Sequence, residues 1–272
     1  MKMVIRGQQY QVNTIGEGEP LLLIHGFSGS GAQWMPFVER WSSQYRLILV
    51  DMLGHGRSAV PSEVERYDME QTTADFAQLL DELGIDAAHV LGYSMGGRIA
   101  LSFAMQYKNR VRSLIVESSS PGLATEQERQ ARRDSDNHLA DTIQQQGIQW
   151  FADYWGNIPL FASLKRLPEN KLAQLQQARL SNSAFGLAQS LRGIGTGQQP
   201  SWWEQLGELT IPVLLIAGEL DEKYCGIATA MQQRLQRSQL KFVADAGHNV
   251  HMEQPHLFDT IVMTFLDEIR MV

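Results

Sequence analysis

The stretch VLGYSMGGR, residues 90–98, decides the fold that this chain can adopt. An apolar run ends in Gly-x-Ser-x-Gly around Ser94, and a segment typical of a helix follows over 98–107. A strand that turns sharply into a helix at this pattern holds the serine in a strained backbone conformation and lifts its hydroxyl above the sheet. Gly92 and Gly96 fit such a turn because a Cβ at either position would collide with neighbouring backbone. Since short Gly and Ser patterns also occur in ordinary turns, the rest of the chain has to supply the context.

Outward from this turn, apolar runs alternate with helical patterns. The runs typical of strands buried on both faces of a sheet lie at 21–24, 47–50, 111–116 and 212–218, with a further strand expected at 241–243 and an edge strand at 8–13. The helical patterns lie at 34–41, 73–83, 98–107, 227–235 and 256–269. This alternation predicts an α/β fold with a mostly parallel, doubly wound central sheet flanked by helices.

The character of the sequence changes after Pro121-Gly122. Residues 123–205 are rich in Gln, Arg and aromatic residues, with helical periodicity and no apolar strand. We interpret this segment as a helical lid inserted before the last strands. The core of the fold is then formed by residues 1–122 and 206–272 together.

Composition limits the function classes. The 272 residues carry a net charge of −7 and no long basic block, so neither nucleic acid nor an anionic membrane is an expected partner. The single cysteine, Cys225, excludes an internal disulfide and fits a reducing compartment. No apolar run approaches the ~20 residues that span a bilayer, and the first residues lack the apolar core of a signal peptide. We expect a soluble, cytoplasmic protein; its oligomeric state is not predictable from the sequence.

Three residues far apart in the chain have the order and placement of a catalytic triad. A serine hydroxyl needs an adjacent base, which a buried acid usually orients, and in sheets of this kind the order is Ser, acid, His. His248 follows the predicted strand at 241–243, and Asp221 follows the strand at 212–218. Glu219 is a weaker substitute for the acid. Taken singly, His248 could be a surface histidine and Asp221 a helix N-cap, but the ordered combination favours a triad with Ser94.

Loops after the predicted strands meet at the carboxyl edge of the sheet, where open α/β sheets bind ligands. The glycine-rich loop after residues 21–24 can offer the backbone N–H of Phe27, and the serine turn can offer that of Met95. Together they would form an oxyanion hole, in which one donor is typically worth ~10²–10³ in rate. His25 and His55 lie in the same loops, and we expect them to brace these loops rather than carry protons.

Taken together, these motifs make the sequence resemble the α/β-hydrolase superfamily over nearly its whole length. The motifs that carry the resemblance are His25-Gly26, Asp51-x-x-Gly54-x-Gly56-x-Ser58, the serine turn, Gly218-x-x-Asp221 and Gly247-His248. The resemblance implies the α/β-hydrolase fold. It says less about the reaction, because this fold hosts esterases, lyases, C–C hydrolases and peroxidases.

A finer pattern, which continues through the lid, resembles the 2-succinyl-6-hydroxy-2,4-cyclohexadiene-1-carboxylate synthase family of menaquinone biosynthesis. The matching segments are 25–29, 92–98, 121–123, 161–164, 191–201 and 218–223. The resemblance implies a lyase that eliminates pyruvate from 2-succinyl-5-enolpyruvyl-6-hydroxy-3-cyclohexene-1-carboxylate by proton abstraction, without hydrolysis or a covalent acyl step. Whether Ser94 or His248 is the immediate proton acceptor stays open.

The same resemblance implies roles for individual residues. Ser94, Asp221 and His248 match the family's triad. The positions that match its substrate-holding residues are Tyr93, Arg98, Arg132 and Arg179, and either Tyr154 or Trp155 matches its lid aromatic. Where some members have Gly-Gly-His before Pro121, this chain has Ser118-Ser119-Ser120, so that histidine has no counterpart.

Independently of the family resemblance, the arginines indicate what kind of substrate the site could bind. Several guanidinium groups around a pocket suit a small polycarboxylate substrate, whereas an esterase lid is usually apolar. Alternatively, the lid arginines are solvated or pair with nearby acids, which is the interpretation we favour for Arg129 and Arg133.

Two other function classes remain open. The first is a serine hydrolase (a carboxylesterase or a C–C bond hydrolase) acting on a small carboxylated substrate; the second, a non-catalytic receptor on the same fold, is disfavoured by the intact triad. We expect no metal and no organic cofactor, because the histidines lack ligand spacing and no phosphate-binding loop occurs.

Overall fold

The computed structural model describes residues 1–271, and its centre is an eight-stranded sheet in the order β1-β2-β4-β3-β5-β6-β7-β8. The strands are β1 (Lys2–Ile5), β2 (Gln8–Ile15), β3 (Glu19–Ile24), β4 (Tyr45–Val50), β5 (Ala88–Tyr93), β6 (Val111–Glu117), β7 (Val213–Gly218) and β8 (Ser238–Val243). From β4 to β8 all neighbours are parallel, whereas β1 and β2 are antiparallel additions. The expected α/β fold with a mostly parallel sheet is confirmed.

The edge of the sheet differs from the prediction. The segment expected at the edge, 8–13, belongs to β2, which lies between β1 and β4. The edge strand is β1, joined to β2 by a tight turn in which Arg6 (φ 45°) and Gly7 (φ 81°) both have positive φ. Such a turn matches the twist of a hairpin. β1 escaped prediction because it has only four residues and a mostly exposed surface.

Helices cover both faces of the sheet, which explains why the strand sequences are continuously apolar. In β3, Leu22 and Ile24 pack into the core cluster that includes α2 (Met69–Glu82), α3 (Met95–Gln106) and α7 (Glu222–Gln232). Leu21 and Leu23, on the opposite face, pack into the cluster that includes Trp41 and Phe258. These two aromatic residues lie on α1 (Met35–Trp41) and α9 (Pro255–Arg270). All four β3 leucine and isoleucine side chains are fully buried.

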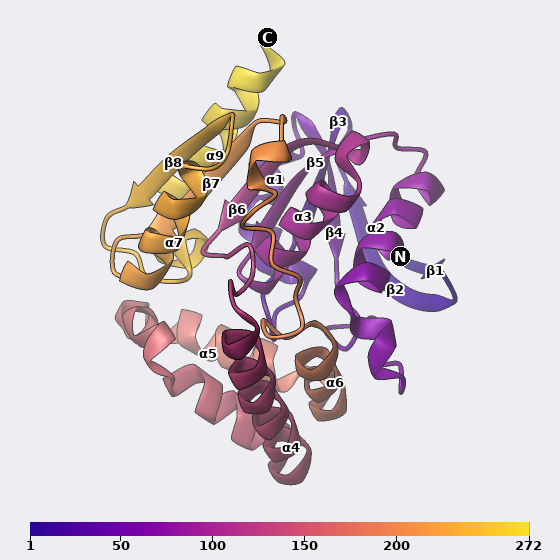
Figure 1. The fold of residues 1–272 in the computed structure, drawn as a ribbon, viewed down its shortest axis with the longest axis vertical. Coiled ribbons are helices and arrows are strands. Elements are labelled where there is room, and N and C mark those ends of the chain that lie inside the picture. Colours follow the sequence, from indigo (N-terminus) through magenta and orange to yellow (C-terminus); the bar gives the residue numbers. More distant parts are fainter. Residues whose placement is uncertain (272) are drawn as a thin grey trace.

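The segment 123–205 contains helices and no strand among the residues described. Its elements are α4 (Glu126–Asn157), η4 (Pro159–Arg166), α5 (Glu169–Leu180) and α6 (Ala184–Ile194). Figure 1 shows that these elements form a separate layer at one end of the sheet. A small apolar core of its own, which includes Ile143, Phe151 and Leu187, holds this layer together. We call residues 123–205 the lid.

The start of α7 also differs from the prediction. The helix expected at 227–235 begins at Glu222, directly after Asp221, whose side chain caps it by accepting the backbone N–H of Tyr224. The first turn escaped prediction because it begins with two exposed, charged residues, Glu222 and Lys223, which give no apolar periodicity. As a result Tyr224 lies one helical turn from Asp221, next to the residues expected to form the triad. Within residues 1–271, no helix is long and apolar enough to cross a membrane.

Candidate active site

The turn between β5 and α3 places Ser94 at the carboxyl edge of the sheet. Ser94 has φ 51° and ψ −110°, a conformation that is strained for a residue with a side chain. A Cβ on Gly92 would lie 2.1 Å from the carbonyl oxygen of Gly96, and a Cβ on Gly96 would lie 2.2 Å from that of Ile24. The two glycines therefore permit the close backbone approach on which the serine turn depends.

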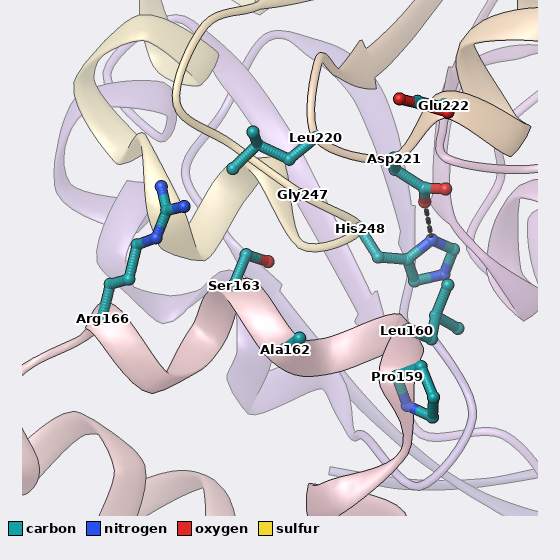
Figure 2. Close-up of a pocket in the computed structure, with 10 residues that line it drawn as sticks. All are labelled: Pro159, Leu160, Ala162, Ser163, Arg166, Leu220, Asp221, Glu222, Gly247 and His248. Atoms are coloured by element: carbon teal, nitrogen blue, oxygen red, sulfur yellow. Dashed lines mark hydrogen bonds and ion pairs between the residues drawn. The ribbon is translucent and has the colours of Figure 1, made fainter.

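His248 connects the serine to the acid. Its Nε2 lies 2.9 Å from Ser94 Oγ, and its Nδ1 lies 2.7 Å from Asp221 Oδ2. In the neutral tautomer that satisfies both contacts, Nδ1–H donates to the carboxylate and Nε2 accepts the serine proton. The imidazole is fully buried, and the hydrogen bond to Asp221 is visible in Figure 2. The arrangement can activate Ser94 as a nucleophile or hold His248 ready as a base.

The alternative to Asp221 as the triad acid, Glu219, lies outside the triad. Glu219 is exposed to solvent, and the carboxylate that is hydrogen-bonded to His248 is that of Asp221. Asp221 also caps α7 through its other oxygen, so the N-cap interpretation and the triad interpretation both describe this carboxylate.

A second buried acid–histidine pair lies beside the triad. His251 Nδ1 lies 2.8 Å and 2.9 Å from the two carboxylate oxygens of Glu117, at the end of β6. The backbone N–H of Ser94 donates to the carbonyl of Glu117 (2.9 Å). The Tyr93 ring lies between the two histidines, with its centroid 4.8 Å from His251 and 5.5 Å from His248. This pair therefore joins the serine turn to the segment that follows His248.

The two backbone donors expected for an oxyanion hole are free to bind a ligand. Met95 is the first residue of α3, so its N–H has no partner within the helix. Within residues 1–271, the N–H of Phe27 makes no hydrogen bond. The positive end of the α3 dipole adds to the preference for negative charge at this position.

Two neutral histidines brace the loops behind these donors. His25 Nε2 accepts the backbone N–H of Met52 (3.0 Å), and its Nδ1 donates to the carbonyl of Gly26 (2.7 Å). Burial lowers the pKa of His25 to about 4 and that of His55 to about 3. Both rings are therefore uncharged near neutral pH.

Arg98 is a buried cation without an acidic partner. Only 8% of its surface is exposed, and its Nη1 donates to the carbonyl of Ile194 (2.9 Å) and to Gln199 Oε1 (3.2 Å). No carboxylate of residues 1–271 lies within ion-pair distance. Burial lowers the pKa of Arg98 to about 10, so the group remains charged near neutral pH. A buried charge of this kind is costly unless a ligand anion compensates it.

Arg132 lies close enough to Arg98 for its charge to contribute to the lowered pKa of Arg98. Its Nε donates to Asp136 Oδ1 (2.8 Å), so this arginine is partly neutralised by the lid. Arg129 and Arg133 both form ion pairs with Glu126, as expected for lid arginines that pair with nearby acids.

Arg179 lines a cavity of about 290 Å³ between the lid and the loop at residues 27–30. Its guanidinium lies 5.9 Å above the ring of Phe161, and burial lowers its pKa. Among the described residues it has no ion-pair partner. Tyr93 and Trp155 line the same cavity.

The two candidates for the lid aromatic point in different directions. Trp155 lines this cavity and packs edge-on against Phe27 at a centroid distance of 5.3 Å. Tyr154 is 46% exposed and stacks on Trp150 at 5.0 Å, beside a separate surface depression. The placement therefore favours Trp155 over Tyr154 as the residue that meets a ligand.

Element η4 of the lid lies over the histidine loop. A second cleft, of about 390 Å³, is bounded by η4, by the segment 220–222 and by Gly247 and His248 (Figure 2). Arg166 stands at its rim in Figure 2. Lid residues thus line two cavities, one that His248 also lines and one that Tyr93, the neighbour of Ser94, also lines.

Tyr224 is the residue that sequence reasoning missed. Its ring centroid lies 4.7 Å from that of His248, and the charges of Arg98 and Arg132 both act on its hydroxyl. The available signal was its spacing of three residues from Asp221, which is one helical turn once α7 is known to start at Glu222. No group of three potential metal-ligating His, Cys, Asp or Glu side chains occurs within residues 1–271.

Fold and site define a serine-triad enzyme of the α/β-hydrolase class, and comparison with known proteins agrees. Residues 19–255 match the family model described as the alpha/beta hydrolase fold, and the chain belongs to this family. It is 44% identical, over 97% of its length and 96% of the relative's, to a protein of Bacillus subtilis (strain 168) provisionally named as 2-succinyl-6-hydroxy-2,4-cyclohexadiene-1-carboxylate synthase.

Two solved structures are also similar. MenH from S. aureus superposes with a TM-score of 0.92 at 34% identity, covering 96% of this chain and 98% of that one. A thermophilic esterase from Thermogutta terrifontis, with malate bound, superposes with a TM-score of 0.87 at 26% identity, covering 99% and 98%. The family resemblance found in the sequence is therefore confirmed.

Proposed function

We propose that the protein is a carbon–oxygen lyase that eliminates pyruvate from 2-succinyl-5-enolpyruvyl-6-hydroxy-3-cyclohexene-1-carboxylate, giving 2-succinyl-6-hydroxy-2,4-cyclohexadiene-1-carboxylate for menaquinone biosynthesis. The observation that carries the proposal is a connected Ser94–His248–Asp221 chain with the buried, acid-free cation Arg98 one helical turn from the serine. A small polycarboxylate would supply the missing negative charge. The B. subtilis relative is provisionally named for the same product. Location in the cytoplasm stays a prediction.

The proposed step needs a base and a stabilised anion. His248, alone or through Ser94, takes the proton from ring carbon C2, and the C–H electrons form the C2=C3 bond. The electrons of the existing C3=C4 bond shift to form C4=C5, and the C5–O bond to the enolpyruvyl group breaks. The leaving enolate recovers a proton and becomes pyruvate, so no water is consumed. In the transition state negative charge develops on the ketone oxygen of the succinyl group, next to the carbon that loses the proton. The N–H groups of Phe27 and Met95 and the guanidinium of Arg98 would stabilise it there.

The test follows pyruvate and water together. Purified protein is incubated with the substrate in ¹⁸O-water, pyruvate is measured with lactate dehydrogenase, and both products are examined by mass spectrometry. We expect stoichiometric pyruvate and no solvent oxygen in the cyclohexadiene product. Pyruvate would exchange its own carbonyl oxygen with water, so the label is read only in the ring product. Absence of pyruvate release would overturn the proposal.

A serine hydrolase is the second candidate, and a specific observation favours it. The same triad geometry serves acyl transfer, and an esterase with malate bound shares the fold closely. Turnover of a small carboxylated ester, with a burst that reports a covalent acyl intermediate, would favour this alternative.

A further inference from the structure

Tyr224 lies beside the triad but has no part in the mechanism given above. Its backbone N–H donates to Asp221 Oδ1 (3.4 Å), while the other oxygen of the same carboxylate holds His248. One carboxylate thus fixes both the imidazole and the helix turn that carries the phenol. The Tyr224 ring packs on the imidazole at a centroid distance of 4.7 Å. The position of the phenol relative to the base is therefore well defined.

The hydroxyl of Tyr224 is a free donor on which the charges of two arginines act. It makes no hydrogen bond within residues 1–271. Burial, the largest effect, raises the pKa of Tyr224, and the charges of Arg98 and Arg132 partly oppose that increase. The phenol therefore stays protonated near neutral pH and can donate a hydrogen bond.

Arg98 has no ion-pair partner among residues 1–271, and the one carboxylate near Arg132 is that of Asp136 in the lid. Arg132 contributes to lowering the pKa of Arg98, which is the effect of a nearby like charge. Arg98 is anchored to Ser94 by the helix bond from its own N–H to the serine carbonyl (3.1 Å), and Tyr224 is anchored to His248 by ring packing. Since Ser94 and His248 lie 2.9 Å apart, Arg98 and Tyr224 each contact one member of the same reacting pair.

We propose that Tyr224 is a specificity-determining residue whose hydroxyl, together with Arg98 and Arg132, binds one substrate carboxylate and places it next to His248. This inference rests on the proposed function, because it adds a group to the same site. A neutral donor that acts with two cations adds a hydrogen bond to an anion without adding to the repulsion between the cations. The site then distinguishes a free carboxylate from its ester or amide at this position.

The test compares Tyr224→Phe with the matched control Tyr107→Phe. Tyr107 follows α3 at the end opposite Ser94 and packs on Phe103 at 5.4 Å. Tyr224→Phe removes one hydroxyl and keeps the ring on His248. For pyruvate formation we expect kcat/KM to fall roughly 10- to 100-fold, as for loss of one hydrogen bond to a charged group. The control should stay within about twofold of wild type, and thermal unfolding should show that both variants fold.

Inhibition by the reaction product, a dicarboxylate, separates binding from a structural effect. If the hydroxyl holds a carboxylate, the inhibition constant of the product rises in Tyr224→Phe by a similar factor. If only the ring matters, because it positions His248, Tyr224→Phe keeps that ring and leaves both kcat and the inhibition constant unchanged, and the proposal is wrong. If wild type releases pyruvate and Tyr224→Phe has the same kcat/KM and the same inhibition constant, the role of Tyr224 is rejected but the proposed function is not. No pyruvate release by wild type would reject the proposed function, and the assignment of Tyr224 with it.

Discussion

At the residue scale, the triad depends on one carboxylate with two attachments. Asp221 holds His248 through one oxygen and caps α7 through the other. The first attachment sets the tautomer of the imidazole, and the second keeps the carboxylate from rotating away. The position of Asp221 relative to His248 is therefore fixed both by their hydrogen bond and by the start of α7.

Removal of either reacting side chain should abolish most turnover. We expect Ser94→Ala and His248→Ala each to lower kcat for pyruvate formation by at least ~10³, because triad members act as a unit. For the same reason the double variant should lose little more than either single variant. Steady-state rates of the three variants test this. Losses that multiply in the double variant would show that the two groups act independently.

The neutral histidines predict how stability depends on pH. The folded-state pKa of His55 is about 3, below the value near 6.5 expected in the unfolded chain, so the unfolded state binds more protons between these values. Stability should therefore fall as pH decreases from about 6.5, by up to about 1.4 kcal/mol per pH unit for this histidine. Urea unfolding between pH 7 and 5 should give a shallower pH dependence for His55→Gln than for wild type. Parallel curves would contradict the prediction.

At the element scale, the β5–α3 unit depends on glycine for reasons of space. A Cβ on Gly96 would lie 2.2 Å from the carbonyl oxygen of Ile24, while a Cβ on Gly226 in α7 would meet nothing within 4 Å. The two helical glycines therefore form a matched pair. Gly96→Ala should destabilise the protein by more than about 2 kcal/mol and impair activity. Gly226→Ala should stabilise it by about 0.5–1 kcal/mol, because alanine favours the helix.

Denaturant unfolding of both glycine variants measures whether the free energy of unfolding falls for Gly96→Ala and rises for Gly226→Ala. A neutral Gly96→Ala variant would mean that the backbone of the serine turn can move away from β3. That result would remove the packing argument for the Gly-x-Ser-x-Gly pattern in this chain.

Sequence patterns predicted the elements that depend on local signals. The serine turn, the buried strands and the order Ser94, Asp221, His248 were all visible as short motifs at strand ends. The partners of the arginines were not, because an ion pair such as Arg132–Asp136 depends on how the lid packs. Tyr224 was missed for a related reason: α7 begins with the charged residues Glu222 and Lys223, and only the cap by Asp221 shows where its first turn starts.

At the scale of the whole molecule, the lid and the core share the walls of the site. Trp155 reaches from α4 to Phe27, a residue of the core loop that offers an oxyanion donor. Arg179 faces the same cavity from α5. Figure 1 shows the lid as a layer attached to the core at one end, so its docking decides how these groups meet the triad.

The neighbouring lid aromatics offer a test of this docking. Trp155→Ala should lower kcat/KM by roughly 10-fold or more, since it removes a cavity wall that packs on Phe27. Tyr154→Ala should change kcat/KM less than about twofold, because Tyr154 stacks on Trp150 at the lid surface. Steady-state kinetics of the two variants decide between the rings. The reverse order of effects would mean that the lid adopts another arrangement during turnover.

The isolated positive charge of Arg98 also has a consequence for the resting enzyme. A guanidinium withdrawn from water with only carbonyl oxygens as partners lowers the free energy of unfolding of the substrate-free protein. An oxyanion that reaches it and neutralises it adds about 2.7 kcal/mol of stability at a concentration one hundred times its dissociation constant. The enzyme is thus at its most heat-sensitive between turnovers, and a scarce substrate would leave it in that vulnerable state.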